Sequence, residues 1–146
     1  MRQPVITSTS DTRKTLLDGN RQVKLDASAT DGDVYLVEGI MPEGSAVPLH
    51  IHEHEDEIFH VLEGQVKVVL GDQTIDGQPG DIVYLPRGIR HSIRTVGATT
   101  ARVLNYVIPG RNFEAFFDAL HQLPPADRSA QRAQLAQAHG ITFLEA

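Results

Sequence analysis

The chain has 146 residues, a formal net charge of −6 and 40% hydrophobic residues. A chain of this length folds as one domain around one core, and its net negative charge argues against nucleic-acid recognition, which needs a basic surface. It contains no cysteine, which excludes disulfides, thiolate metal sites and cysteine nucleophiles.

Nothing in the sequence predicts a membrane protein or a secreted one. No apolar run approaches the roughly 18 residues that a membrane span needs. Residues 1–11 are polar and lack the apolar segment of a secretory signal. We therefore expect a cytoplasmic protein with no membrane partner.

The first part of the chain predicts an all-β fold. Residues 1–11 read as a loose tail or an exchanged arm. Between Arg21 and Ile108, short strand-like runs alternate with turn residues every eight to twelve positions, which is typical of a β-sandwich or barrel. The clearest expected strands cover residues 34–40, 57–63, 65–70, 73–75, 81–85, 92–95 and 101–108.

After Pro109 and Gly110 the pattern changes to helix. We expect Asn112 to cap a first helix, whose apolar stripe of Phe113, Phe116, Phe117 and Leu120 would pack against the outside of the sandwich. Asp127 is expected to cap a second helix that ends near residue 138, and residues 141–144 alternate as if returning to the sheet. The prediction is a single domain over 1–146, with a core at about 21–108 and a helical tail at about 112–146.

Four side chains form a candidate metal site. His50 and His52 lie one residue apart on an extended segment, so their side chains point to the same side. Glu57 follows a few residues later, and His91 supplies a third imidazole from farther along the chain. Imidazoles with one carboxylate suit iron, manganese, nickel, cobalt, copper or zinc, and we expect one such divalent ion per chain.

These residues resemble the two motifs of the cupin superfamily. Gly44, His50, His52, Glu57 and Gly64 fit every fixed position of the first motif, G-x5-H-x-H-x(3,4)-E-x6-G. The second motif, G-x5-P-x-G-x2-H-x3-N, is matched except at its last position; the positions are Gly80, Pro86, Gly88, His91 and, where the family often has Asn, Thr95. That Asn is not a metal ligand in the family.

The resemblance implies more than the spacing shows. It implies a cupin-type jelly-roll sandwich or barrel, with the C-terminal helices packed outside, and a metal held by His50, His52, Glu57 and His91. Within the superfamily the chain looks like small single-domain proteins that resemble quercetin dioxygenase. Homodimers are common among them, so we expect a homodimer.

The sequence is compatible with two roles for Glu57. It completes the ligand set, or it remains an unbound carboxylate whose pKa an apolar cavity would raise, so that it could act as general base; the two roles do not exclude each other. If Glu57 points inward, so do Phe59 and Val61. Ile93 shares the inward face with His91, and Tyr35 is a further candidate for the substrate pocket.

The neighbouring polar residues are expected to lie outside the site. The segment of Glu53, His54, Glu55 and Asp56 is interpreted as a solvated turn near the cavity mouth, whose carboxylates could add negative potential there. His54 is expected to be a loop histidine; the alternatives are a metal ligand or a group that supports the ligands.

The resemblance favours a metal-dependent dioxygenase that acts on a small aromatic or enolisable substrate, with Glu57 as the catalytic base. One alternative is a non-redox cyclase, isomerase or decarboxylase in which the metal is a Lewis acid. Another is a small-molecule-binding protein without turnover, because a fold alone does not fix a function.

Overall fold

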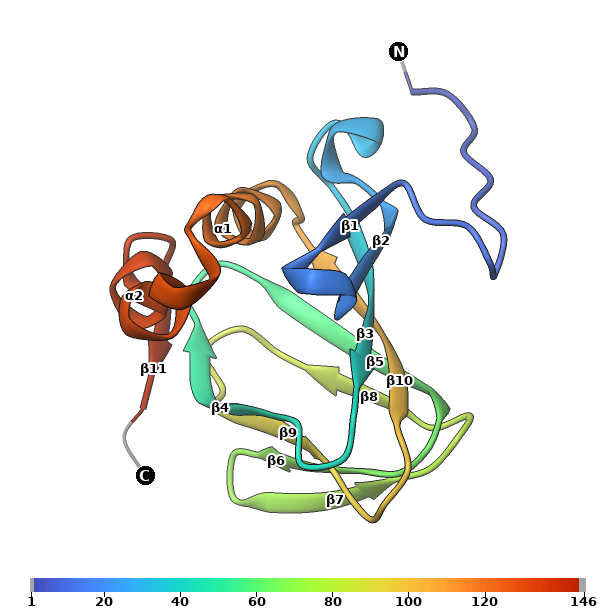
Figure 1. Ribbon diagram of the computed structural model, residues 1–146, viewed down its shortest axis with the longest axis vertical. Helices are drawn as coiled ribbons and strands as arrows, with labels where there is room; N and C mark the ends of the chain where they lie inside the picture. The colour runs from blue at the N-terminus through green and yellow to red at the C-terminus, as the bar shows by residue number, and fades with distance from the viewer. Residues whose placement is uncertain (1, 145–146) are drawn as a thin grey trace.

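The computed structural model describes residues 2–144, which form two antiparallel sheets packed as a sandwich (Figure 1). One sheet has six strands in the order β1-β2-β3-β10-β5-β8, and the other has five in the order β11-β4-β9-β6-β7. The predicted jelly-roll sandwich with two C-terminal helices is confirmed. Neither helix in the described part of the chain is long and apolar enough to cross a bilayer.

The six-stranded sheet contains β1 (Lys14–Leu16), β2 (Arg21–Leu25), β3 (Tyr35–Met41), β10 (Ala101–Ile108), β5 (Asp56–Glu63) and β8 (Ile82–Leu85). The five-stranded sheet contains β11 (Ile141–Phe143), β4 (Ala46–His52), β9 (His91–Thr95), β6 (Val66–Leu70) and β7 (Gln73–Gly77). Two short 3-10 turns, η1 (Leu17–Gly19) and η2 (Ala27–Thr30), flank β2.

Strand alternation decides which side chains face the interior. In β5, Glu57, Phe59 and Val61 are buried while their neighbours in sequence are more exposed. In β9, His91, Ile93 and Thr95 are buried in the same way. A period of two places these residues on one face of each sheet. Both strands therefore present one polar ligand candidate and one or more apolar side chains to the space between the sheets.

The turn before β9 positions His91. Gly88 has a φ of +81°, a conformation that glycine adopts without steric cost. Its amide donates a hydrogen bond of 2.8 Å to the backbone carbonyl of His52. The glycine of the second motif thus links the turn directly to β4, and β9 starts with His91 facing inward.

The helices lie together at one end of the sandwich, beside β1 and β11 (Figure 1). Helix α1 (Arg111–Gln122) buries the predicted stripe of Phe113, Phe116, Phe117 and Leu120. Helix α2 (Pro125–Gln137) follows, and β11 returns to pair with β4, as the alternation of residues 141–143 predicts.

Two helix boundaries differ from expectation. Gly110, not Asn112, is the N-cap of α1. A Cβ at Gly110 would lie 2.4 Å from the amide nitrogen of Tyr35, so only glycine fits this position. Asn112 lies inside the helix. Asp127 likewise lies in the first turn of α2, which Pro124 precedes as the N-cap.

The buried apolar residues form two clusters. One joins β1, β2 and the start of β3 to the aromatic stripe of α1. The other fills the sandwich between β5, β6, β8, β9 and β10. The candidate ligands lie among these apolar side chains, so the site is shielded from bulk water.

Candidate metal centre

The four predicted ligands converge between the two sheets. His50 and His52 come from β4 and His91 from β9, in the five-stranded sheet, where His50 and His91 are register partners. Glu57 approaches from β5 in the opposite sheet. One ligand atom from each residue lies within 4.8 Å of the others, and all four side chains are buried. The sequence spacing thus corresponds to one compact group of donors.

The donor atoms face one another without satisfying one another. Oε2 of Glu57 lies 3.1 Å from Nε2 of His52 and 2.9 Å from Nε2 of His91. None of these three buried atoms has a hydrogen-bond partner of acceptable geometry among residues 2–144. Unpaired buried polar atoms are rare and call for an explanation. Lone pairs that point at one common position fit a bound cation.

The outer ring nitrogens fix the direction of the imidazoles. Nδ1 of His50 lies 2.7 Å from the carbonyl oxygen of Pro48, and Nδ1 of His91 lies 3.4 Å from that of Ile89. A carbonyl only accepts, so the ring donates from Nδ1 and its Nε2 keeps a lone pair. His52 is held in the same way by a carboxylate. This arrangement is the one that metal-bound histidines use.

Glu55 is the carboxylate that holds His52. Its Oε1 lies 3.0 Å from Nδ1 of His52, and its Oε2 accepts a hydrogen bond of 3.0 Å from Asn112 of α1. The residue is 1% exposed. The expectation of a solvated turn is therefore wrong for Glu55, although Glu53 and His54 beside it are exposed.

Burial and neighbouring charges shift the pKa values of the candidate ligands. Burial alone would raise the pKa of Glu57, but the facing imidazoles of His52 and His91 outweigh it and lower that pKa to about 2. The raised pKa expected for an unbound Glu57 is thus not found. Burial and the neighbouring His91 lower the pKa of His50 to about 4, whereas Glu57 and Glu55 raise that of His52 despite its burial.

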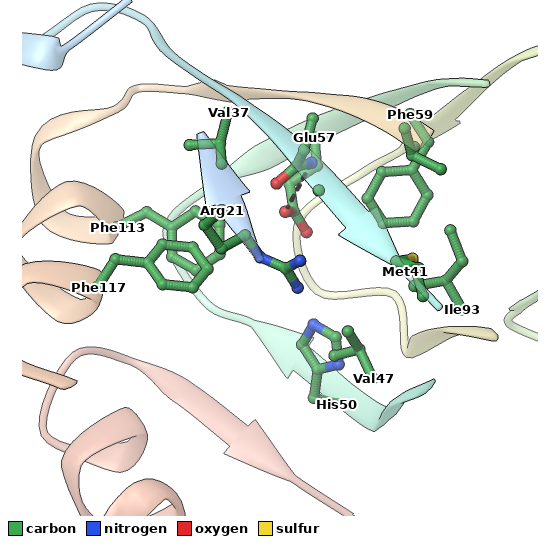
Figure 2. Close-up of a pocket in the computed structure, with 13 residues that line it drawn as sticks. Arg21, Val37, Met41, Val47, His50, Glu57, Phe59, Ile93, Phe113 and Phe117 are labelled. Atoms are coloured by element: carbon green, nitrogen blue, oxygen red, sulfur yellow. Dashed lines mark hydrogen bonds between the residues drawn. The ribbon is translucent and has the colours of Figure 1, made fainter. Parts of the chain in front are cut away.

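A cavity opens beside these ligands (Figure 2). Its free space, counted together with the open solvent beside it, is about 510 Å³. Phe59 and Ile93 line it, together with His50 and Glu57. The remaining lining residues are Arg21, Val37, Gly39, Met41, Val47, Val103, Asn105, Phe113 and Phe117.

Two residues expected in the pocket are not in its lining. Val61 points inward, but it lies two positions beyond Phe59 on β5 and packs in the sandwich core. Tyr35 belongs to the other cluster, with ring centroids 6.5 Å from Phe113 and 6.4 Å from Phe117. These two phenylalanines pack against the sheet as expected, and they also line the cavity.

Asn105 and Arg21 are cavity residues that the sequence did not single out. Asn105, on β10, donates a hydrogen bond of 3.2 Å to Oε1 of Glu57, the oxygen that does not face the imidazoles. It thereby orients the carboxylate. Neither residue belongs to a motif, and only the pairing of β10 with β5 and of β2 with β3 brings them to the site.

Known proteins share this fold and part of this sequence. Residues 36–107 match the cupin domain family. Quercetin 2,3-dioxygenase of Bacillus subtilis is 34% identical over 107 residues, which cover 72% of this chain and 31% of that protein. An oxalate-binding protein of Thermotoga maritima is 34% identical over 68 residues, 47% of this chain and 56% of that one.

A solved structure shares the fold of this chain. The crystal structure of a predicted oxalate decarboxylase from Thermotoga maritima superposes with a TM-score of 0.59 and 28% identity, over 61% of this chain and 78% of that chain. The chain spans between about a third and somewhat more than half of the length of these two curated relatives. With the motif residues gathered around one position between two jelly-roll sheets, the chain is a member of the cupin superfamily.

Proposed function

We propose that this cupin is a metal-dependent enzyme, and that its reaction is the dioxygenation of a small aromatic or enolisable compound. The observation that carries the proposal is the set of unpaired, buried donor atoms at the edge of a cavity lined mainly by apolar residues. The similarity to quercetin 2,3-dioxygenase supports the choice of reaction.

The donor set fits a transition metal. Three imidazoles and one carboxylate, with no thiolate, suit iron, manganese, nickel, cobalt, copper or zinc. His50, His52, Glu57 and His91 would hold the ion. A bound ion would supply Lewis acidity at a substrate oxygen and, for the redox-active metals, one-electron chemistry.

The side chains around the ion have separate tasks. Glu57 is ionised, so it is suited first to be a ligand; Oε2 is also placed to accept the proton of a substrate hydroxyl group. With a pKa of about 2 it is a weak base, since an effective general base has a pKa near the working pH. Phe59, Ile93 and Phe113 would exclude water from the reacting groups.

Oxygen consumption tests the reaction class. Protein loaded separately with iron, manganese, nickel or zinc is mixed with flavonols and other enolisable phenols in an oxygen electrode. We expect oxygen uptake with at least one redox-active metal and none with zinc or with the His52→Ala variant. Substrate loss without oxygen uptake would contradict a dioxygenase.

The second candidate is non-redox chemistry of a carbonyl or carboxylic compound, such as cyclisation, isomerisation or decarboxylation. The structural similarity to a predicted oxalate decarboxylase favours it. Turnover by the zinc-loaded protein without oxygen would support this candidate. Tight ligand binding with no turnover at all would point to a binding protein.

A homodimer is part of the proposal. Strand β8 forms one edge of the six-stranded sheet, and its outward side chains Ile82 and Tyr84 are 65% and 55% exposed. Exposed apolar edge strands invite association. Light scattering after size exclusion should give twice the chain mass, and a monomer would remove this part of the proposal.

A further inference from the structure

The cavity contains a cation that the metal site does not use. Arg21 is the first residue of β2, and its inward parity matches that of the buried Val23. Figure 2 shows its guanidinium group reaching into the space between Glu57 and His50. The positive group therefore lies where a ligand of the metal would extend into the cavity.

Arg21 has no acidic partner among residues 2–144. Its one hydrogen bond runs from Nη1 to the backbone carbonyl of Asn20, 3.1 Å away. By contrast, Arg87, Arg102 and Arg128 each pair with a carboxylate. A guanidinium group has five donors in a planar fork, so most of those of Arg21 remain free.

The surroundings hold the guanidinium group without neutralising it. It lies 5.9 Å from the ring centroid of Phe117, an aromatic face that attracts cations. Glu57 faces the same cavity and attracts the guanidinium group without forming an ion pair with it, and burying the charge costs free energy. Burial accordingly lowers the pKa of Arg21, although arginine stays charged at neutral pH.

The opposite strand makes room for this side chain. Gly39 is the register partner of Arg21 on β3, and a Cβ at Gly39 would lie 3.0 Å from Nη1 of Arg21. Gly39 is not among the residues with positive φ, so the backbone does not demand glycine here. The missing side chain instead lets the guanidinium group lie against β3 and face the cavity.

We propose that Arg21 binds a carboxylate of the substrate while the metal ion holds a hydroxyl or carbonyl oxygen of the same molecule. The inference rests on the proposed function and narrows its substrate class to hydroxy- or oxo-carboxylic acids that are aromatic or enolisable. The planar fork matches the two oxygens of a carboxylate. The rest of the lining is largely apolar and lacks the additional donors that a phosphate dianion would need.

Binding to the zinc-loaded protein tests this inference without any turnover. The probes are phenol and the three isomeric monohydroxybenzoates, measured by isothermal titration calorimetry. We expect at least one hydroxybenzoate to bind at least about tenfold more tightly than phenol, the effect of one charge-assisted contact. In Arg21→Gln this preference should fall to within about twofold, while phenol affinity stays unchanged.

Two further variants keep the test decisive. Arg94→Gln removes an equal charge from an exposed position of β9 and should retain the preference. Arg21→Lys keeps the charge without the fork and should retain part of it. If the Gln variant folds poorly by circular dichroism, the Lys variant and the wild-type comparison with phenol decide the question.

The outcomes separate this inference from the proposed function. Failure of the wild-type protein to take up zinc would overturn the metal site itself. Full zinc content with no preference for any hydroxybenzoate, or with the preference retained in Arg21→Gln because the carboxylate binds zinc, would overturn only the role of Arg21.

Discussion

The cavity has two walls of different construction. The metal-facing wall consists of β4, β5 and β9, and its polar atoms are held by hydrogen bonds of 2.7, 3.0 and 3.2 Å to Pro48, Glu55 and Asn105. The other wall consists of β2 and α1, where Phe113, Phe117 and Arg21 meet chiefly through packing. The first wall holds donors at fixed positions, as metal binding requires. The second wall adds apolar faces and one cation, so it is suited to select the substrate, although Phe113 also packs edge-on against His52 with ring centroids 4.9 Å apart.

The largest effect is expected when a metal ligand itself is replaced. Replacing His52 with Ala removes a buried donor of the metal-facing wall, and we expect metal content to fall from about one ion per chain to near zero. The sandwich should remain folded by circular dichroism. Elemental analysis of dialysed protein is the measurement.

His54→Ala is the matched control, because His54 is exposed and lies two residues away on the same segment. It should keep its full metal content. Equal metal content in the two variants would remove His52 from the site.

Glu55 tests whether the metal-facing wall extends beyond the ligands. In Glu55→Gln the carboxylate that orients His52 is lost, and metal affinity should fall by about 10- to 100-fold. Competition with a chelator measures the affinity. Glu53→Gln, at an exposed position in the same turn, should change nothing; an effect as large as that of Glu55→Gln would mean that charge alone, not orientation, matters.

Protonation distinguishes the ligands within that wall. In metal-free protein, Glu57 and Glu55 raise the pKa of His52 above its ordinary 6.5 despite burial, while burial and His91 lower that of His50 to about 4. As the pH falls, His52 should therefore gain a proton before His50, which should stay neutral until about pH 4.

Metal needs neutral imidazoles, so metal affinity should weaken as the pH falls through the pKa of His52. A titration of the ring nitrogens by nuclear magnetic resonance follows each histidine separately. Protonation of His50 before His52 would reverse the electrostatic description of the site.

The smallest effect is expected where the two walls meet. Asn112 of α1 donates to Glu55 and to the carbonyl oxygen of His139. Asn112→Ala should lower the free energy of unfolding by about 1 kcal/mol and metal affinity by less than about tenfold, since Glu55 keeps its contact with His52. Thermal melts and chelator competition measure both, with the exposed Gln131→Ala as control. A loss of metal as complete as in His52→Ala would show that the helix, and not the sheet, sets the metal geometry.

The same contrast explains what the sequence could predict. His50, His52 and Glu57 lie within eight residues, and strand alternation plus the motif spacing suffices to group them. The fold class follows from similarly local patterns. Phe59 and Ile93 follow from parity with the ligands, and both line the cavity.

The remaining cavity residues depend on contacts between distant segments. Arg21 lies at the site because β2 pairs with β3 opposite Gly39, and Phe113 because α1 packs against β1 and β3. No local pattern encodes either contact. The burial of Glu55 could not be predicted, because the residue lies in a turn, where no periodicity indicates which side chain is buried.

The central claim is that three imidazoles and one carboxylate surround a single ion. X-ray absorption at the zinc edge of the zinc-loaded protein measures this coordination directly. We predict three imidazole nitrogens at about 2.0–2.1 Å with one or more oxygen ligands, and no sulfur. A shell with one imidazole or none, or with oxygen alone, would contradict the site.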